Sequence, residues 1–315
     1  MPIIEVKNLK KYFGKTRAVD DISFAVEKGE IFGFLGPNGA GKTTTIRCLL
    51  DFLRPTSGKI NILGLDANKN SDQIKHKISY LSGDVRLYDG WTGEDHIKFL
   101  EALRGQKSIA EKLISDLNFN PRMKFKNLSS GNKQKLGLIL ALMFEPKLLI
   151  MDEPTLGLDP LLQNKIYEIL DKFQKKGTTI FFSSHNLAEV DRMCDRVGII
   201  KDGKLVAIER ISELKEKRMH TVKVYFAGPF NRDEFTFENT KIIKDLPEGL
   251  ELGVKGDINL LIRKLTNFNI RELEITHATL EDIFLEFYEA DGQNKNSQPY
   301  ADREQNDLMA IPKLE

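Results

Sequence analysis

Short runs of apolar residues, interrupted by turn residues, fill the first part of the chain. Residues 3–9 (IIEVKNL) and 19–30 (VDDISFAVEKGE) have strand-like lengths and patterns, which predicts antiparallel β structure. Residues 29–36 (GEIFGFLG) then lead into a glycine-rich loop. Beyond the loop, apolar residues recur at i, i+3, i+4 and i+7, as on one face of a helix that Pro55 and Gly58 are expected to end. This face comprises Ile46, Leu49, Leu50 and Leu53.

Helical periodicity predominates from residue 93 to about residue 144, for example in HIKFLEALRG and KQKLGLILALMF. Asn120 and Pro121 interrupt it. The pattern therefore predicts a helical insert, spanning about residues 88–145, within a larger domain.

Two apolar strands follow at residues 147–151 and 178–184, and a helix over residues 161–176 separates them. Gly177 is expected to close that helix. A strand, helix and strand at this spacing predict a parallel sheet. Further on, the Asp202–Gly203 dipeptide lies between two strand patterns and predicts a hairpin.

The pattern changes again after residues 215–218, and a small second α/β domain is expected. In it Thr279 and Asp282 form a variant of the capping box at the start of a helix. The polar, aperiodic residues 291–315 are expected to be disordered. The predicted elements are a strand at 221–228, a helix at 258–268, a strand at 271–278 and a helix at 276–289. The predicted domains are 1–218, 219–290 and the tail 291–315.

Composition narrows the function classes. The chain has 47 basic and 46 acidic residues and a formal charge of +1, so it lacks the general positive field of a nucleic-acid-binding protein. Its two cysteines, Cys48 and Cys194, have no metal-ligand spacing and suit a reducing compartment. No apolar run approaches the ~18 residues that span a bilayer, and the N-terminus has no signal-peptide pattern.

The loop Gly36–Thr45 (GPNGAGKTTT) matches G-x-x-x-x-G-K-[ST] through Gly36, Gly41, Lys42 and Thr43. It lies between an apolar strand and an amphipathic helix, which is the context that this phosphate-binding motif requires. Its backbone N–H groups and the helix N-terminus would surround phosphate oxygens, Lys42 would reach the β and γ phosphates, and Thr43 would bind Mg²⁺. The alternative is a glycine-rich turn that only caps a helix.

Two acidic residues end the strand LLIMDEP. Asp152 stands where the apolar run stops and is a candidate Mg²⁺ ligand. Glu153 follows directly, where a carboxylate could orient and deprotonate the water that attacks the γ-phosphate. The combination predicts an ATPase, whereas a solvated charge at a strand end is the alternative for Glu153.

His185 ends the next strand, in SSH, at the equivalent carboxyl edge of the sheet. Ligands of open α/β sheets collect at this edge, so His185 is a candidate for a hydrogen bond to the γ-phosphate. A capping or core histidine is the alternative.

Five motifs in the order GPNGAGKT, NLSSGNKQKLGL, LLIMDEP, LGLD and SSH resemble those of the nucleotide-binding subunit of ABC transporters, over about residues 3–218. The resemblance implies a P-loop NTPase core with an antiparallel β subdomain. It also implies that residues 128–132 (LSSGN) are the signature motif that caps the ATP of a second subunit. Ser129 and Gly131 would contribute there, although SSG read alone is equally a plain N-cap. Asp159 matches the D-loop and is also a candidate N-cap, with Pro160 at the first helical position.

The resemblance extends to the cofactors and the adenine site. Phe13 stands where the family has an aromatic residue that stacks on adenine, and core packing or Tyr12 in its place are the alternatives. The expected cofactors are ATP and Mg²⁺. The expected nucleotide-binding residues are Phe13, Gly36, Pro37, Asn38, Gly39, Ala40, Gly41, Lys42, Thr43, Thr44, Ser129, Gly131 and Asp159, with Glu153, His185 and Lys42 as catalytic residues and Thr43 and Asp152 as metal ligands.

Two departures from the family pattern stand out. The Q-loop glutamine expected after the strand ISYLS is absent, since the sequence continues Ser82, Gly83, Asp84. Asp84 is either a substitute or a surface carboxylate. The signature motif has Ser130 and Asn132 where glycine and glutamine are commoner.

The implied protein is an ATP-binding and ATP-hydrolysing transporter subunit, cytoplasmic and held on the inner face of the membrane by a separate permease. Its expected partners are a second ATP-binding subunit and the permease, without nucleic acid, and the C-terminal segment ATLEDIFLEFYE resembles that of exporter ATPases of the ABC-2 type. Trp91 lies near the expected permease-docking region, as an anchor or as core filling. The alternatives are a non-transport ABC ATPase acting on nucleic acid or the ribosome, and a catalytically weak regulatory subunit.

Overall fold

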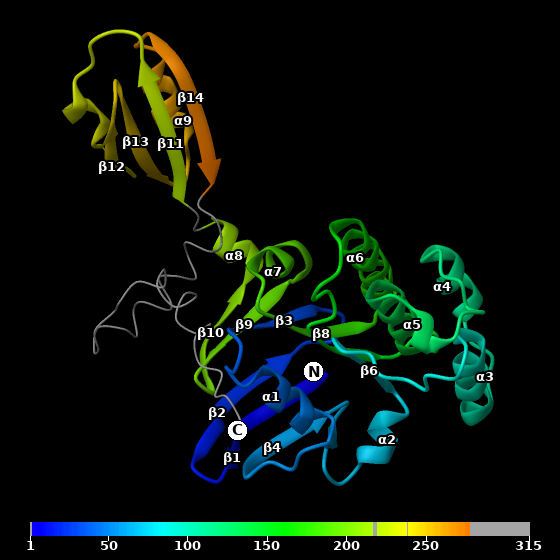
Figure 1. Cartoon of the computed structure of the whole chain (residues 1–315). Helices are drawn as coiled ribbons and strands as arrows, with labels where there is room; N and C mark the ends of the chain where they lie inside the picture. Colours follow the sequence, from blue (N-terminus) through cyan, green and yellow to red (C-terminus); the bar gives the residue numbers. More distant parts are fainter. Residues whose placement is uncertain (1, 217–218, 238, 278–315) are drawn as a thin grey trace, which may run out of the picture.

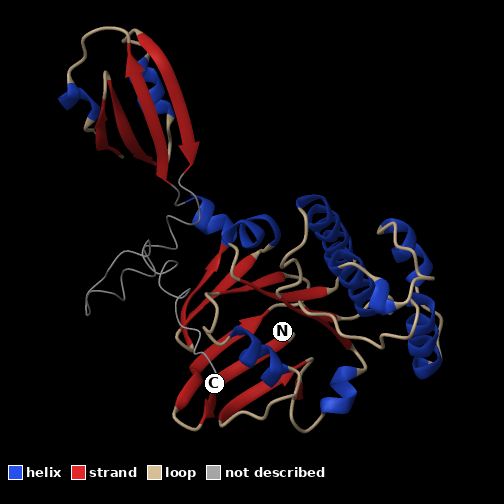
Figure 2. Ribbon diagram, viewed as in Figure 1, coloured by secondary structure: helices blue, strands red, loops and turns tan. Residues whose placement is uncertain are grey.

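The computed structural model describes residues 2–216, 219–237 and 239–277, which form three β-sheets with helices packed on them (Figures 1 and 2). The strand orders are β2-β1-β4-β5, β10-β9-β3-β8-β7-β6 and β12-β13-β11-β14. The first two sheets and their helices carry the five motifs that resemble those of the ABC transporter subunit.

The six-stranded sheet is parallel except at one edge. Strands β3 (Ile31–Leu35), β6 (Ile78–Ser82), β7 (Leu148–Asp152), β8 (Thr179–Ser184) and β9 (Arg196–Lys201) run in one direction. Only β10 (Lys204–Arg210) is antiparallel, in a hairpin with β9. Every residue of β3, β7 and β8 is buried, because helices or the other sheet cover both faces. The carboxyl ends of the parallel strands therefore meet at one edge.

The antiparallel sheet packs on one face of the six-stranded sheet. It consists of β1 (Ile4–Phe13), β2 (Thr16–Val26), β4 (Ser57–Ile62) and β5 (Leu65–Asp66), as the pattern of the first thirty residues predicts for β1 and β2. Phe24 of β2 stacks on Phe32 and Phe181 of the larger sheet, with ring centroids 5.9 and 6.0 Å apart. Helix α1 (Lys42–Leu49) contributes Ile46 and Leu49 to the same core.

The helices of residues 93–142 match the predicted helical stretch. They are α3 (Gly93–Arg104), α4 (Ala110–Asp116) and α5 (Ser130–Leu142), and the short η1 (Phe125–Asn127) follows the break expected at Asn120 and Pro121. Helix α5 packs on β6, while α3 and α4 pack on α5 (Figure 1). A capping box starts α3, since the Thr92 side chain accepts from the Asp95 N–H and the Asp95 side chain accepts from the Thr92 N–H. Helix α6 (Pro160–Lys175) follows β7, and α7 (Leu187–Met193) follows β8. The structure also has α2 (Ser71–Lys75) and α8 (Ile211–Glu216).

Two boundaries are informative. Helix α1 is shorter than its apolar pattern predicts, because Asp51 has φ of 56° and turns the chain away after Leu49. Leu53 lies beyond the helix but still packs on its core. The hairpin turn is confirmed, since Asp202 and Gly203 both have positive φ, 49° and 77°.

The third sheet is antiparallel and packs one face on its own apolar core. It contains β12 (Thr240–Leu246), β13 (Gly249–Lys255), β11 (Met219–Phe226) and β14 (Ile270–His277), with η2 (Arg232–Phe235) and α9 (Asn259–Leu265). Strands β11 and β14 and helix α9 were predicted, whereas β12 and β13 were missed. The helix predicted at 276–289, the Thr279–Asp282 capping box and the tail 291–315 lie outside the described residues, except for the first two positions of that helix, which end β14.

Candidate functional site

The phosphate-binding loop joins β3 to α1 in a backbone conformation that requires glycine. Gly39 and Gly41 have φ of 80° and 107°, which other residues rarely adopt. A Cβ on Gly36 would lie 2.3 Å from the Ile200 carbonyl oxygen, and one on Gly41 would lie 2.4 Å from the Ala18 carbonyl oxygen. The loop is also tied to the β9–β10 hairpin, because the Gly203 N–H donates to the Ala40 carbonyl at 3.1 Å. Pro37, Asn38 and Gly39 remain exposed.

Lys42 begins α1 and is buried, with 5% of its side chain exposed. Its Nζ donates to the carbonyl oxygens of Gly36 at 2.7 Å and Pro37 at 3.1 Å. It also forms an ion pair with Glu153, 3.1 Å from Oε1. The lysine thus links the loop to the end of β7 through charge-assisted contacts.

Asp152 and Ser183 face each other across the β7–β8 pair. Ser183 Oγ donates to Asp152 Oδ1 at 2.6 Å and accepts from the Glu153 N–H at 3.1 Å. Glu153 has φ of 49°, so the chain turns sharply after the strand. One serine therefore fixes both the side chain of the first acidic residue and the backbone of the second.

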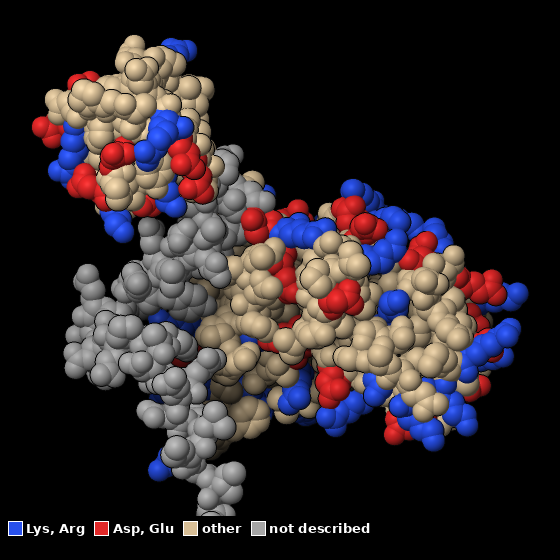
Figure 3. Space-filling view, turned by 45° about the horizontal axis from the view of Figure 1, so that its top comes forward, with Lys and Arg blue, Asp and Glu red and all other residues tan. Residues whose placement is uncertain are grey.

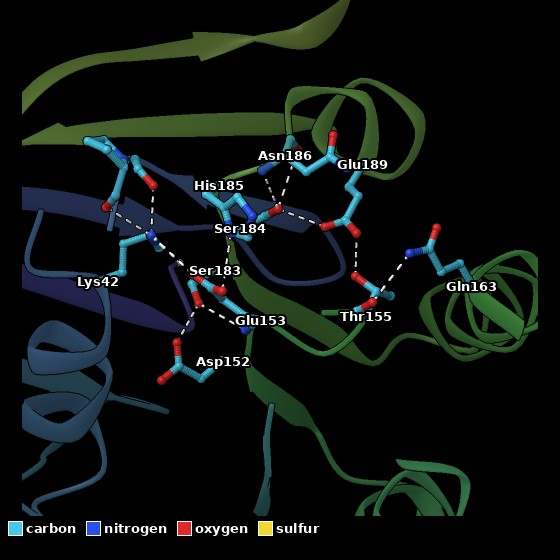
Figure 4. A network of polar contacts seen from close by, with 12 residues as sticks. Lys42, Asp152, Glu153, Thr155, Gln163, Ser183, Ser184, His185, Asn186 and Glu189 are labelled. Atoms are coloured by element: carbon cyan, nitrogen blue, oxygen red, sulfur yellow. Dashed lines mark hydrogen bonds and ion pairs between the residues drawn. The ribbon is translucent and has the colours of Figure 1, made fainter. Parts of the chain in front are cut away.

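Glu153 lies between two cationic or polar groups (Figure 4). Its Oε1 contacts Lys42, and its Oε2 lies 3.2 Å from His185 Nδ1. The Glu153 side chain is 19% exposed and that of His185 is 42% exposed, so the pair opens to solvent. The structure brings Lys42, Asp152, Glu153 and His185 together at one sheet edge, as the sequence predicts.

The residues suggested for Mg²⁺ have suitable donor atoms. Thr43 is in the first turn of α1, and Asp152 is 9% exposed at the end of β7. One Asp152 oxygen is engaged by Ser183, and within residues 2–216 no hydrogen bond is found to the other oxygen or to the Thr43 hydroxyl. Hydroxyl and carboxylate oxygens are the ligands that Mg²⁺ prefers, so these two residues fit the ion.

The residues predicted for the signature motif and the D-loop start two other helices. Ser129 is the N-cap of α5 and accepts from the Asn132 N–H at 3.4 Å. Asp159 is the N-cap of α6, accepts from the Leu162 N–H at 3.0 Å, and precedes Pro160 at the first position, as predicted. In the part of the chain that the structure describes, no hydrogen bond or ion pair joins Ser129, Gly131 or Asp159 to the phosphate-binding loop. These residues remain separate from the site that Lys42 and Glu153 form.

The candidate adenine-stacking residue is exposed. Phe13 is 47% exposed, and Lys11 Nζ lies 4.9 Å from its ring centroid, so core packing is not its role. Tyr12 instead donates from its hydroxyl to Asp20 at 2.5 Å, a hydrogen bond that raises the pKa of Tyr12.

The segment after β6 has no glutamine but packs closely on the site. A Cβ on Gly83 would lie 2.8 Å from the carbonyl oxygens of both Asp152 and Glu153. Asp84 is exposed and pairs with Arg86 at 2.7 Å, which supports the surface reading of this carboxylate. A groove of about 790 Å³ follows, and Arg47, Asp84, Arg86 and Arg104 contribute its charges.

Trp91 is half-buried in an aromatic cluster beside this groove. Its ring centroid lies 4.7 Å from that of Tyr88, 5.3 Å from His96 and 5.4 Å from Phe99. Tyr88 and Phe99 are 62% and 47% exposed. The exposed aromatic surface here therefore belongs to Trp91's neighbours more than to Trp91 itself.

Sequence reasoning missed several polar residues of the site: Ser183, Ser184, Thr155, Gln163 and Glu189. The serines stand next to His185 in SSH, and two consecutive serines at the end of an otherwise apolar strand are a usable signal. Glu189 gave no signal, because its burial depends on contacts with Thr155 and Ser184 that only the fold creates.

Comparison with known proteins decides the family. The ABC transporter family matches residues 19–156. The bacitracin transport ATP-binding protein BcrA of Enterococcus faecalis is 40% identical over 225 residues, 70% of this chain and 73% of that protein. The chain belongs to the ATP-binding subunits of ABC transporters. The linearmycin resistance ATP-binding protein LnrL of Bacillus subtilis is 36% identical over 219 residues, 67% of this chain and 70% of that protein.

Solved structures agree. The ATP-binding subunit of an ABC transporter superposes with a TM-score of 0.63 at 29% identity, over 68% of this chain and 92% of that one. The ADP conformation of MJ1267, an ATP-binding cassette of an ABC transporter, superposes with a TM-score of 0.59 at 27% identity, over 68% of this chain and 94% of that one. As an ABC transporter ATP-binding subunit the chain has the predicted P-loop NTPase fold, binds ATP and is an ATPase that acts in transport. Among the residues described, no helix has the length and apolarity needed to cross a membrane.

Proposed function

We propose that this ABC transporter subunit hydrolyses ATP at the edge formed by β3, β7 and β8, and that it thereby powers export by a separate permease. The relatives named for bacitracin transport and linearmycin resistance support export. The single observation that carries the proposal is the contact of Glu153 with both Lys42 and His185, because it joins a phosphate-binding cation to a base and a second proton-bearing group.

The phosphate-binding loop and α1 would bind the nucleotide. Backbone N–H groups of residues 36–44 and the helix N-terminus would hold the phosphates. Thr43 and Asp152 would hold Mg²⁺, which when bound offsets phosphate charge. ATP would draw Lys42 Nζ from Glu153 to the β and γ phosphates, and the carboxylate would become free to act.

Hydrolysis falls to Glu153 and His185. The Glu153 carboxylate orients a water molecule and accepts its proton as the water oxygen bonds to the γ-phosphorus and the bond to the β-phosphate oxygen breaks. His185, 3.2 Å from Glu153, donates a hydrogen bond to the γ-phosphate. Phe13, which is exposed, stacks on adenine.

A second ATP-binding subunit, identical or related, completes each site. Ser129, Gly131 and Asp159 lie at the N-termini of α5 and α6, whose unpaired N–H groups favour anions. They would contact the ATP held by the partner's loop. Closure of the two subunits around ATP then moves the permease, and hydrolysis separates them.

The permease would dock at the groove behind β6, where Asp84, Arg86 and Arg104 offer charges and Tyr88 and Phe99 offer exposed rings. This would hold the chain at the inner face of the membrane. On the face shown in Figure 3, basic and acidic side chains intermingle and no large area of positive charge gathers, so nucleic acid is not an expected partner. Residues 1–218, with the insert 88–145, would form the ATPase domain, and residues 219–290 an accessory one.

The test is Glu153→Gln in the full-length chain. We expect the ATPase kcat to fall at least ~10²-fold, while ATP affinity changes less than about threefold, because the amide cannot accept the proton. Glu145→Gln is a matched control, since Glu145 also has positive φ (48°) and an ion pair, 2.9 Å to Lys176, but precedes β7. Its kcat should not change. Equal rates for Glu153→Gln and the wild type would remove Glu153 from the proposed role.

A further inference from the structure

Glu189, in the first turn of α7, is a buried carboxylate that has no direct part in the proposed reaction. The residue is 8% exposed, and no ion pair to it is found in the described part of the chain. Burying a carboxylate is unfavourable unless hydrogen bonds satisfy both of its oxygens. The contacts that compensate this burial therefore indicate what the residue does.

Both oxygens of Glu189 accept hydrogen bonds from buried hydroxyl groups (Figure 4). Thr155 Oγ1 donates to Oε1, and Ser184 Oγ donates to Oε2 at 2.7 Å. Hydrogen bonds to a charged acceptor are stronger and shorter than neutral ones, so this bridge is firm.

The two hydroxyls belong to the segments that carry the reacting groups. Thr155 follows Glu153 by two residues, and Ser184 directly precedes His185. The Glu189 carboxylate thus joins the turn after β7 to the end of β8. It lies on the side of the Glu153–His185 contact that faces away from Lys42 (Figure 4). A cavity of about 70 Å³ lies here. These five residues line it together with Leu156 and Asn186.

Further contacts fix the two segments. Gln163 Nε2 of α6 donates to the Thr155 carbonyl at 3.3 Å, and the Asn186 N–H donates to Ser184 Oγ at 2.8 Å. Burial, and then the nearby charge of Glu189, raise the pKa of Tyr167 well above its usual value, so Tyr167 stays a neutral neighbour of the carboxylate. Contacts from α6, α7, β7 and β8 therefore converge on one place.

We propose that Glu189 is a positioning residue for ATP hydrolysis, whose carboxylate holds Glu153 and His185 in the relative geometry that the reaction needs. The inference rests on the roles proposed above for those two residues. Lys42 and the phosphate-binding loop do not contact the bridge, so its loss should slow turnover and leave ATP binding nearly intact.

The experiment measures kcat and KM for ATP of the full-length chain carrying Glu189→Ala, Glu189→Gln, Thr155→Val or Ser184→Ala. Misplacement of a reacting group by ~1 Å can cost 10²-fold. We expect Glu189→Ala to lower kcat about 30-fold or more, with KM within threefold. Thr155→Val and Ser184→Ala each break one link and should lower kcat less. Glu189→Gln can keep both links if one hydroxyl reverses direction, so it should restore kcat to within about fivefold of the wild type.

Thr178→Val separates positioning from a general loss of stability. Thr178 Oγ1 is buried and donates to the Pro146 carbonyl at 3.0 Å, next to the opposite end of β8. Its loss should lower Tm, because it removes one buried hydroxyl and its hydrogen bond, yet leave kcat unchanged.

Three results would overturn the proposal: a Glu189→Ala kcat within twofold of the wild type, an equal loss of kcat in Thr178→Val, or a rise in KM at constant kcat. If Glu189→Ala does not fold, the two hydroxyl variants and Glu189→Gln decide by the same criteria. Glu153→Gln is assayed in parallel. An active Glu153→Gln would show that the proposed reaction is at fault, whereas an inactive one beside an active Glu189→Ala would reject the role of Glu189 alone.

Discussion

The edge of the six-stranded sheet and the core of the third sheet bury different kinds of side chain. The edge buries polar and charged side chains, among them Lys42, Asp152, Ser183 and Glu189. The third sheet buries apolar residues such as Phe226, Phe235 and Leu252, and within residues 219–277, apart from the gap at 238, Thr240 is its only buried polar residue. Buried polar groups are costly unless they are satisfied, so their concentration marks the edge as the chemical region and the third sheet as a packing unit.

The largest effect should come from removing the buried cation. Lys42→Ala should lower kcat/KM for ATP by roughly 10³-fold, because the loss of a preorganised charge at a phosphate is rarely compensated. Lys175→Ala serves as the control, since Lys175 is exposed and pairs with Asp171 of the same helix, α6. If both variants hydrolyse ATP at comparable steady-state rates, the buried Lys42 does not mark the sheet edge as the chemical region.

The second-largest effect should come from a substitution that creates a cavity in the core of the third sheet. Phe235 is fully buried, and its ring lies 5.4 Å from Phe226 and 5.1 Å from Phe268. Phe235→Ala should destabilise this unit by about 3 kcal/mol without changing the ATPase rate. Hydrogen exchange of peptides from residues 219–277 measures the first quantity. Ile243→Ala, at a 48% exposed position, should have little effect, and a joint loss of protection and activity in Phe235→Ala would show that the regions are coupled.

The two cysteines report on residues 2–216 and not on the third sheet, because Cys48 and Cys194 are the only ones in the chain and both are buried in the apolar cores of that part. Burial raises the pKa of Cys48 from 9.0 to about 11, which reduces its thiolate fraction at pH 8 about 100-fold. Burial also raises the pKa of Cys194. A thiol reagent should therefore react at least ~100-fold more slowly with the native chain than with the unfolded one. Phe235→Ala should leave that rate unchanged, and a faster reaction would contradict the independence of the two cores.

The smallest effect concerns the surface of the third sheet. Arg271 and Glu248 are 2.7 Å apart, with side chains 54% and 70% exposed. Solvent and salt screen such pairs, so Arg271→Ala should change the stability of this unit by no more than about 0.5 kcal/mol. Hydrogen exchange of the same peptides tests it, and a loss near that of Phe235→Ala would mean that the unit depends on its surface charges.

The same contrast explains what the sequence could predict. The parallel strands at 147–151 and 178–184 were predicted well because fully buried strands are continuous apolar runs. Strands β12 and β13 were missed, since β12 is half-exposed and interrupted by Lys and Asp, and a Pro-Glu-Gly turn obscures the alternation.

At the site, residues inside motifs were predicted and brought together, as Lys42, Asp152, Glu153 and His185 show. Glu189 was invisible because an acidic residue in the first turn of a helix is ordinary, and only its contacts with Thr155 and Ser184 distinguish it. The roles assigned to Ser129, Gly131 and Asp159 stay predictions, since they concern a second subunit.

The hairpin turn at Asp202–Gly203 resembles a spare surface loop, the usual place to insert a tag or a reporter. The Gly203 N–H, however, donates to the Ala40 carbonyl, and the Gly203 carbonyl accepts from the Asp20 N–H at 2.7 Å. The turn therefore connects the phosphate-binding loop to β2. Engineers who lengthen this tip should expect weaker nucleotide affinity, although no inserted residue would come near the ATP.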